Sequence, residues 1–234
     1  MANKDLKYLK EHVREQLKKG MATEFLEPHE LKIVIPFLNK ANISYQTFHL
    51  FHESEKVILY HTQKPNLTCY QVVSKVSFRH QDILGSIFSH QINKNLFGDI
   101  IMMNGNFYIT ILSSMKNYFT SFFTMIGNQR ITLKEVPLET VSSYQYQFIT
   151  KKVMVPSMRI DVVLAKLLGT SRSTILEKIK VNEVVRNYEV VKNKALELKE
   201  GDILSIRKYG KYQIAEKEGT TKKGNQILNI KKYC

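Results

Sequence analysis

The lysine and arginine side chains of this sequence give the clearest indication of what it binds. Residues 151–234 hold 19 Lys and Arg against nine Asp and Glu, whereas residues 1–150 hold 16 against 12. A basic segment joined to a nearly neutral one is typical of proteins that bind a polyanion, most simply a nucleic acid. We therefore expect a phosphate-binding face in the last third of the chain. The candidates are Arg159, Arg172, Lys178, Lys180, Arg186 and Arg207.

Arg172 is the candidate with the clearest local setting. Ser171 is expected to cap a helix, which places Arg172 in the first turn, where a cation opposes the helix dipole. Free backbone N–H groups and an arginine at a helix start would instead suit a bound phosphate. Each cation taken singly reads as an ordinary solvated side chain, but together they favour phosphate binding. Composition alone leaves RNA, DNA and an anionic membrane open as partners.

Two short helices and several strands are expected to carry these cations. Apolar residues recur at helical spacing over 159–168, and Gly169 marks the end of that helix. Gly201-Asp202 supplies a turn further along the chain. The other expected elements are a helix over 172–181 and strands over 184–186, 189–191, 196–198 and 203–207.

The middle of the chain reads as a ferredoxin-like (RRM-like) domain. Asn104-Gly105 is the strongest short hairpin signal in the sequence, and helices on one face of an antiparallel sheet are expected around it. Such a sheet can bind RNA through exposed aromatic residues, but Phe107 and Tyr108 point to opposite faces, so at most one could do so. The expected elements are strands over 70–78, 99–103, 107–112 and 130–136 and helices over 81–90 and 113–125.

The remaining segments complete an α+β protein with a helical N-terminus. Leu9, Val13 and Leu17 recur at helical spacing, and Pro28 suits the first position of a second helix. Two strands are expected after it, over 43–51 and 56–60. The expected divisions are a helical segment at 1–40, the ferredoxin-like domain at 41–137, a linker at 138–157 and the basic domain with a basic tail at 158–234.

Residues for catalysis, metal binding or cofactor binding do not form a set with suitable spacing. His49 and His52 face opposite sides of an expected strand, and neither they nor His61 have a cysteine pair nearby, so we expect no metal site. The glycines are too dispersed for a dinucleotide or methyl-donor loop. We therefore expect no catalytic residue, no cofactor and no small-molecule substrate.

The compartment is expected to be the cytoplasm. No run of 18 apolar residues indicates a transmembrane segment, and the first residues lack the pattern of a signal peptide. Cys69 and Cys234 do not indicate a disulfide framework. A soluble monomer is the expectation.

The C-terminal segment resembles the ribosomal protein S-four-type RNA-binding domain, the alpha-L fold. Three motifs carry the resemblance: Met158-Arg159-Ile160-Asp161, Ser171-Arg172-Ser173 and Glu200-Gly201-Asp202-Ile203. The sequence departs from the family where Arg186-Asn187-Tyr188 replaces a Val-Asn-Gly hairpin. Because Tyr adopts a left-handed turn less readily than Gly, we expect that hairpin to be reshaped.

Nearly the whole chain resembles the YlmH family of bacterial RNA-binding proteins. The motifs are Phe25-Leu26-Glu27-Pro28, Arg79-His80-Gln81-Asp82-Ile83-Leu84-Gly85, Gly98-Asp99-Ile100-Ile101 and the tail from Tyr209-Gly210-Lys211-Tyr212. Helix capping and packing are the expected roles of His80 and Asp82. The family's usual loop is replaced at His49-Leu50-Phe51, so no role is carried over to it.

The resemblance implies a non-enzymatic factor that binds rRNA and tRNA on the large ribosomal subunit. Family members are implied to act on subunits obstructed by peptidyl-tRNA, in ribosome-associated quality control, and have also been linked to cell division. The residues implied in RNA binding are Arg159, Ser171, Arg172, Lys178, Lys180 and Arg186, with Lys208, Lys211, Lys222 and Lys223 as phosphate contacts.

Two alternatives stay open beside this interpretation. The first is an RNA-modifying enzyme with a site in the middle domain, and the second is a division-associated protein that uses its basic face on anionic lipid. If the RNA interpretation holds, Arg172→Glu is expected to weaken ribosome binding without unfolding the domain.

Overall fold

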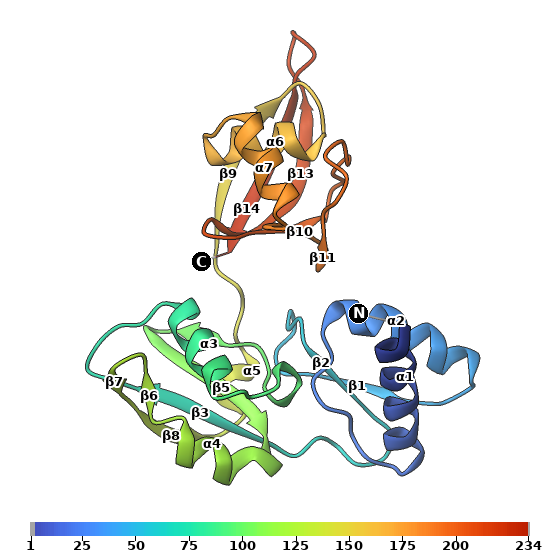
Figure 1. Ribbon diagram of the computed structural model, residues 1–234, viewed down its shortest axis with the longest axis vertical. Helices are drawn as coiled ribbons and strands as arrows, with labels where there is room; N and C mark the ends of the chain where they lie inside the picture. The colour runs from blue at the N-terminus through green and yellow to red at the C-terminus, as the bar shows by residue number, and fades with distance from the viewer. Residues whose placement is uncertain (1–2, 234) are drawn as a thin grey trace. The chain divides into compact units, whose positions relative to one another are not determined.

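A computed structural model describes residues 3–233 and has the expected α+β composition. The chain divides into two compact units, residues 1–145 and 146–234, each with its own core (Figure 1). No helix within residues 3–233 is long and apolar enough to cross a membrane. Cys69 is buried as a free thiol, and Cys234 lies outside the described residues.

The first unit begins with two helices that pack on a two-stranded antiparallel sheet. Val13 and Val34 from the helices meet Val57 and Leu59 from the sheet in one buried cluster. The strands expected over 43–51 and 56–60 therefore cover the N-terminal helices, because the apolar faces of these helices need a partner. The elements are α1 (Asn3–Lys18), α2 (Pro28–Lys40), β1 (Gln46–His49) and β2 (Val57–Tyr60).

The second part of this unit has the predicted ferredoxin-like topology. Its four strands lie in the order β4-β5-β3-β8, all antiparallel, and helices α3 and α4 pack on one face. The β4–β5 hairpin turns through Asn104 and Gly105, both with positive φ, as predicted. The elements are β3 (Leu67–Val73), α3 (His80–Ser89), η1 (Lys94–Leu96), β4 (Ile101–Met103), β5 (Asn106–Leu112), η2 (Ser113–Met115), α4 (Lys116–Phe122), β6 (Met125–Ile126), β7 (Gln129–Arg130), β8 (Thr132–Val136) and α5 (Glu139–Ser142).

The helix predicted over 113–125 is shorter than expected. It starts as a 3₁₀ turn and continues as α4 only to Phe122, and residues 125–130 form the small hairpin β6–β7. Gly127 takes a left-handed conformation with φ 59° in the turn of this hairpin. The β-branched and long apolar residues before it favour the extended backbone.

Both faces of the two central strands of the four-stranded sheet, β3 and β5, are largely covered. Phe107 is 7% exposed on one face and Tyr108 is 8% exposed on the other. Neither ring can therefore stack on a base, and the usual RNA platform of an RRM-like sheet is closed in this protein.

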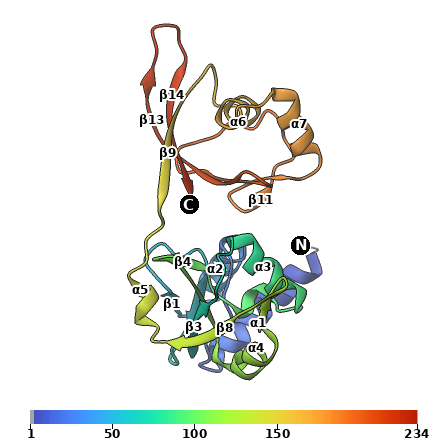
Figure 2. The same ribbon diagram turned by 90° about the vertical axis from the view of Figure 1, so that its left-hand side faces the viewer.

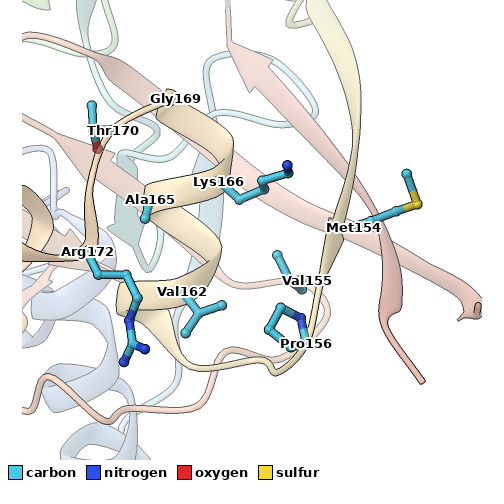
Figure 3. A pocket seen from close by; sticks show the side chains of 9 residues that line it. All are labelled: Met154, Val155, Pro156, Val162, Ala165, Lys166, Gly169, Thr170 and Arg172. Carbon is cyan, nitrogen blue, oxygen red and sulfur yellow. The ribbon is translucent and has the colours of Figure 1, made fainter. Parts of the chain in front are cut away.

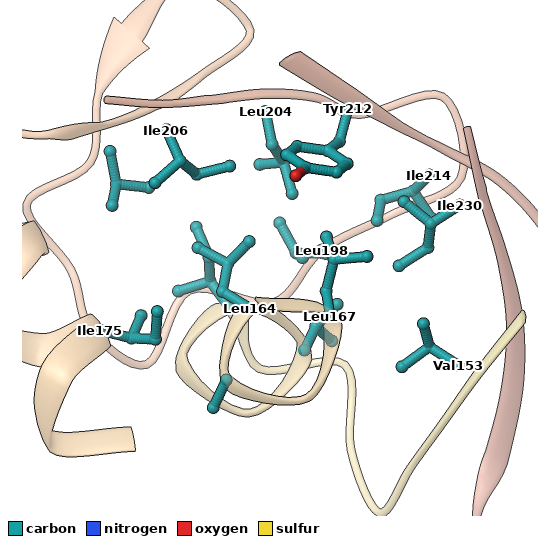
Figure 4. Packing of buried hydrophobic residues seen from close by; sticks show 14 of the residues in the cluster. Val153, Leu164, Leu167, Ile175, Leu198, Leu204, Ile206, Tyr212, Ile214 and Ile230 are labelled. Carbon is teal, nitrogen blue, oxygen red and sulfur yellow. The ribbon is translucent and has the colours of Figure 1, made fainter. Parts of the chain in front are cut away.

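The second unit is a six-stranded antiparallel sheet with two helices on one face (Figure 2). Leu164, Leu167 and Ile175 from the helices pack against Leu204 and Ile214 from the strands, and all are buried (Figure 4). The strand order is β11-β10-β12-β13-β14-β9. The elements are β9 (Phe148–Val155), α6 (Ile160–Leu168), α7 (Arg172–Lys180), β10 (Val184–Arg186), β11 (Glu189–Val190), β12 (Ile203–Ile206), β13 (Gly210–Thr220) and β14 (Gln226–Tyr233).

Three segments of the second unit differ from the sequence-based expectation. Residues 148–155, assigned to the linker, form β9, which pairs with β14 along its whole length. The expected basic tail forms β13 and β14, whose register is interrupted by irregularities after Ile214 and Lys217 that hide the alternating pattern of a strand. Residues 196–198 contribute only the isolated bridge between Arg159 and Glu197.

Candidate nucleic-acid interface

Asp161 organises the start of both helices in the second unit. Its carboxylate, 0% exposed, accepts hydrogen bonds from Arg159 at 3.1 and 3.2 Å and from Arg172 at 3.2 and 2.6 Å. The Arg159 and Arg172 side chains are themselves 40% and 56% exposed. Asp161 therefore holds two guanidinium groups side by side, with part of each facing solvent.

The charge of Asp161 is stabilised by this arrangement. Burial alone would raise the pKa of its carboxyl, but the hydrogen bonds from Arg159 and Arg172 outweigh burial and hold that pKa below its usual value. Ser171 caps α7 as predicted, with Oγ accepting from the Thr174 N–H at 3.1 Å. Arg172 thus begins a well-capped helix while its guanidinium is bound to a neighbouring helix.

Glu183 gathers a second group of cations after α7. Lys178 Nζ lies 2.8 Å from this carboxylate and Arg207 Nη1 lies 3.8 Å from it. The hydrogen bond from Lys178 lowers the pKa of Glu183. Lys178 is only 16% exposed and lies over the Tyr209 ring, whereas Arg207 is 73% exposed. Of this pair, Arg207 is therefore the one that reaches solvent.

Asp202 fixes the β10–β11 hairpin. It accepts from Arg186 Nε at 2.7 Å and from Asn187 Nδ2 at 2.8 Å. Asn187 and Tyr188 both take left-handed backbone conformations, with φ 49° and 69°. Asp202 anchors the turn, and Tyr188 adopts a left-handed conformation that Gly would take more easily, while the reshaping of this hairpin relative to the family stays a prediction.

Four of the predicted lysines are exposed without a strong ion pair. Lys180 reaches only Glu177, at 4.0 Å, and both side chains are solvent-exposed, so that pair contributes little. Lys208, Lys222 and Lys223 are exposed and have no ion-pair partner among residues 3–233. Lys222 and Lys223 lie at the tip of the β13–β14 hairpin, which projects beyond the rest of the second unit (Figure 1). These cations are available to a phosphate backbone.

Lys211 has a different setting from the other candidates. Its ammonium lies 4.7 Å from the centre of the Tyr233 ring and 5.3 Å from that of Tyr188. Burial lowers the pKa of Lys211 to about 8. The structure therefore places it in an aromatic cluster, and its contact with phosphate stays a prediction.

A shallow groove lies between β9 and α6, next to the cluster of Asp161, Arg159 and Arg172, which we call the Asp161 group. Figure 3 shows Val162 of α6 facing Val155 and Pro156, and the groove, which Ala165 also lines, has a volume of about 490 Å³. Lys166, which is exposed, and Arg172 supply cationic groups among its lining residues. An apolar floor with cations beside it suits a ribose or base next to a phosphate.

The predicted cations thus differ in whether a poorly exposed carboxylate binds them. Arg159, Arg172, Lys178 and Arg186 are each bound to a carboxylate that is at most 19% exposed. The sequence-based interpretation gave these carboxylates no role in holding the cations and did not name Lys166 as a candidate. Only the position of an acidic residue in the first turn of an apolar helix, two residues after Arg159, could have indicated the role of Asp161.

Comparison with known protein families identifies a domain in the first unit. A family model described as "Putative RNA-binding domain in YlmH" matches residues 70–140. This range contains α3, α4 and the four-stranded sheet except the first three residues of β3. The match agrees with the motifs at Arg79–Gly85 and Gly98–Ile101.

Two similar proteins extend the comparison. The "Ribosome-associated protein quality control protein P2" of Bacillus subtilis (strain 168) is 26% identical over 148 residues, which cover 63% of this chain and 58% of that protein. The match therefore spans less than two thirds of the relative. A solved structure of "Cell division protein ylmH from Streptococcus pneumoniae" has a TM-score of 0.49 at 21% identity and covers 61% of this chain and 97% of that chain.

Proposed function

We propose that the chain is a member of the YlmH family and a non-enzymatic RNA-binding factor of the large ribosomal subunit. Its ligands would be rRNA and peptidyl-tRNA on stalled subunits, in ribosome-associated quality control. The S-four-type identity of the second unit is part of this proposal. Support comes from the RNA-binding domain model at residues 70–140 and from the ribosome-associated function that the Bacillus subtilis relative is named for.

The distribution of charge in the second unit carries the proposal. Its least exposed carboxylates, Asp161, Glu183 and Asp202, are already bound to cations, so they do not oppose an approaching polyanion. The exposed lysines at 180, 208, 222 and 223 are left facing solvent. Such a surface binds a phosphate backbone with an affinity that falls steeply as salt is raised.

Sedimentation of the protein with large ribosomal subunits tests this proposal. We expect comigration at low salt, loss at high salt and enrichment on stalled subunits. The variant Lys222→Glu/Lys223→Glu should weaken binding and make the dependence of log K on log salt shallower by about 1.4–1.8, because each lost phosphate contact removes about 0.7–0.9.

A matched variant separates local contacts from net charge. Lys40→Glu/Lys64→Glu changes the net charge equally in the first unit, where both side chains are exposed. It should leave the salt dependence close to that of the unmodified protein. Equal effects of the two variants, or recovery of the protein only at the top of the gradient at every salt concentration, would contradict the proposal.

The two alternatives predict other results. An RNA-modifying enzyme would show a thermal shift with S-adenosylmethionine, and a membrane-associated division protein would float with anionic liposomes. The family and its relative are described by RNA binding and quality control, which favours the binding factor.

A further inference from the structure

A second groove lies in the first unit, between α3, the loop before it and the β6–β7 hairpin. Its volume is about 630 Å³, within the range of sites that hold small ligands. The hairpin is tied to the helix by the Gly127 N–H, which donates to Ser86 Oγ at 3.1 Å. All of these elements fall in residues 70–140, the range of the RNA-binding domain model.

The lining of this groove combines apolar surface with polar side chains that are largely uncharged. Side-chain amides and hydroxyls come from both walls, and Phe78 adds an aromatic ring. Amides and hydroxyls recognise the edges of nucleic-acid bases, which are accessible when the bases are unpaired. The uncharged polar lining residues are Ser77, Gln81, Ser86, Ser89, Asn128 and Gln129.

Three exposed cations adjoin the lining residues of the groove along the chain, and we call them its cationic rim. Lys75, Arg79 and Arg130 are exposed, and each directly adjoins a lining residue in sequence or lies between two of them. Asp82 is the one acidic lining residue, and it is bound by Arg79 at 2.8 Å in the predicted helix cap. The rim therefore complements a phosphate backbone that passes the groove.

Gly85 supplies an independent observation. It sits inside α3, exposed, where glycine costs about 1 kcal/mol relative to alanine. A Cβ built on it would meet nothing within 4 Å, so no close packing requires glycine there. Because Gly85 lines the groove, its missing side chain keeps the groove open.

We propose that this groove binds an unpaired nucleotide of the RNA, with the base between α3 and the β6–β7 hairpin and phosphates at the cationic rim. Because Phe107 and Tyr108 of the four-stranded sheet are buried, we assign RNA recognition in this domain to α3 and the β6–β7 hairpin. The inference rests on the proposed RNA-binding function. It assigns base contacts to the first unit, while the lysines of the second unit position the RNA through its phosphates.

The test uses the full chain, a short fluorescent single-stranded RNA and a duplex of the same length. Gly85→Leu fills the groove from a position with free space, and removing a helical glycine favours the fold. It should weaken single-strand binding about tenfold, comparable to one lost base contact, and change duplex binding little. Ser121→Leu, on the exposed surface of α4, is the matched control and should bind both RNAs normally.

The outcomes separate this inference from the proposed function. If Gly85→Leu binds single-stranded RNA as tightly as the unmodified protein while Lys222→Glu/Lys223→Glu loses affinity, the groove is not a nucleotide site and the proposed function stands. If Ser121→Leu weakens binding as much as Gly85→Leu, the groove assignment is also overturned. If the unmodified protein binds neither RNA nor ribosomal subunits, the proposed function itself fails.

Discussion

Arg172→Glu provides a sharp test of the Asp161 group. The sequence-based expectation was weaker RNA binding without unfolding. In the structure Arg172 donates two hydrogen bonds to a carboxylate that is 0% exposed, so the substitution removes a partner and adds a second negative charge. We now expect the second unit to be destabilised.

The magnitude follows from the geometry. Breaking a buried ion pair costs about 3–5 kcal/mol, but Arg159 still binds Asp161 and the Arg172 side chain is 56% exposed, so the lost pair should cost about 2–3 kcal/mol. Repulsion between two carboxylates about 5 Å apart adds up to about 3 kcal/mol at an effective dielectric constant near 20, less where solvent reaches them. A total of about 3–5 kcal/mol is a large part of the stability of such a unit.

Hydrogen exchange read by mass spectrometry is the suitable assay, because it reports on the two units separately. Amides of α6, α7 and β13 should lose protection in Arg172→Glu, whereas those of β3 and β5 should not change. Lys180→Glu, in the same helix but with an exposed and distant partner, should change protection by less than about 0.5 kcal/mol.

The pH dependence gives a second readout. The pKa of Asp161 is lower in the folded protein than in the unfolded chain, so its contribution is present above the unfolded value near 3.8 and is lost as pH falls below it. The difference between Arg172→Glu and the unmodified protein should therefore shrink in strong acid. Unchanged protection in Arg172→Glu at neutral pH would refute the reasoning.

Three further predictions concern single positions. Lys208→Gly should stabilise the second unit by about 1 kcal/mol in thermal unfolding, because Lys208 has φ 71°. The same variant should weaken RNA binding, because it removes an exposed cation. Lower stability together with weaker binding would contradict this separation of the two effects. Burial raises the pKa of Asp99 to about 6, so the free energy of unfolding should fall as pH rises from about 4 to 6. In urea unfolding followed across that range, Asp99→Asn should remove this dependence. An unchanged slope in the variant would contradict the role of Asp99. Gly85→Ala should raise the free energy of unfolding by about 1 kcal/mol, and a destabilised variant would show a packing role for Gly85 that the structure does not contain.

Local signals explain which parts of the fold could be predicted. The Ser171 cap, the Gly169 helix end and the Asn104-Gly105 hairpin each depend on a few consecutive residues, and the structure confirms them. Strands β13 and β14 were missed because bulges disturb their alternation, although they pair with each other as a hairpin. Strand β9 was missed because its pairing with β14 is visible only in three dimensions.

The same reasoning applies to the candidate site. Clustered cations are visible in the sequence, but their carboxylate partners are not, since Arg172 and Asp161 are separated by 11 positions and Arg186 and Asp202 by 16. Local spacing therefore predicts a basic surface without showing which of its members are held in place. That distinction decides which substitutions report on binding and which report on stability.

The pairing of β9 with β14 has a consequence for how the second unit folds. During synthesis β9 leaves the ribosome first and stays without its partner until residues 226–233 follow, while Ile149 and Met154 are more than half exposed even in the finished sheet. An unpaired strand with apolar side chains is prone to pair with another chain. Because loop closure across residues 156–225 precedes the final sheet, this unit should fold slowly and as a whole. Its nascent state is the one most exposed to aggregation.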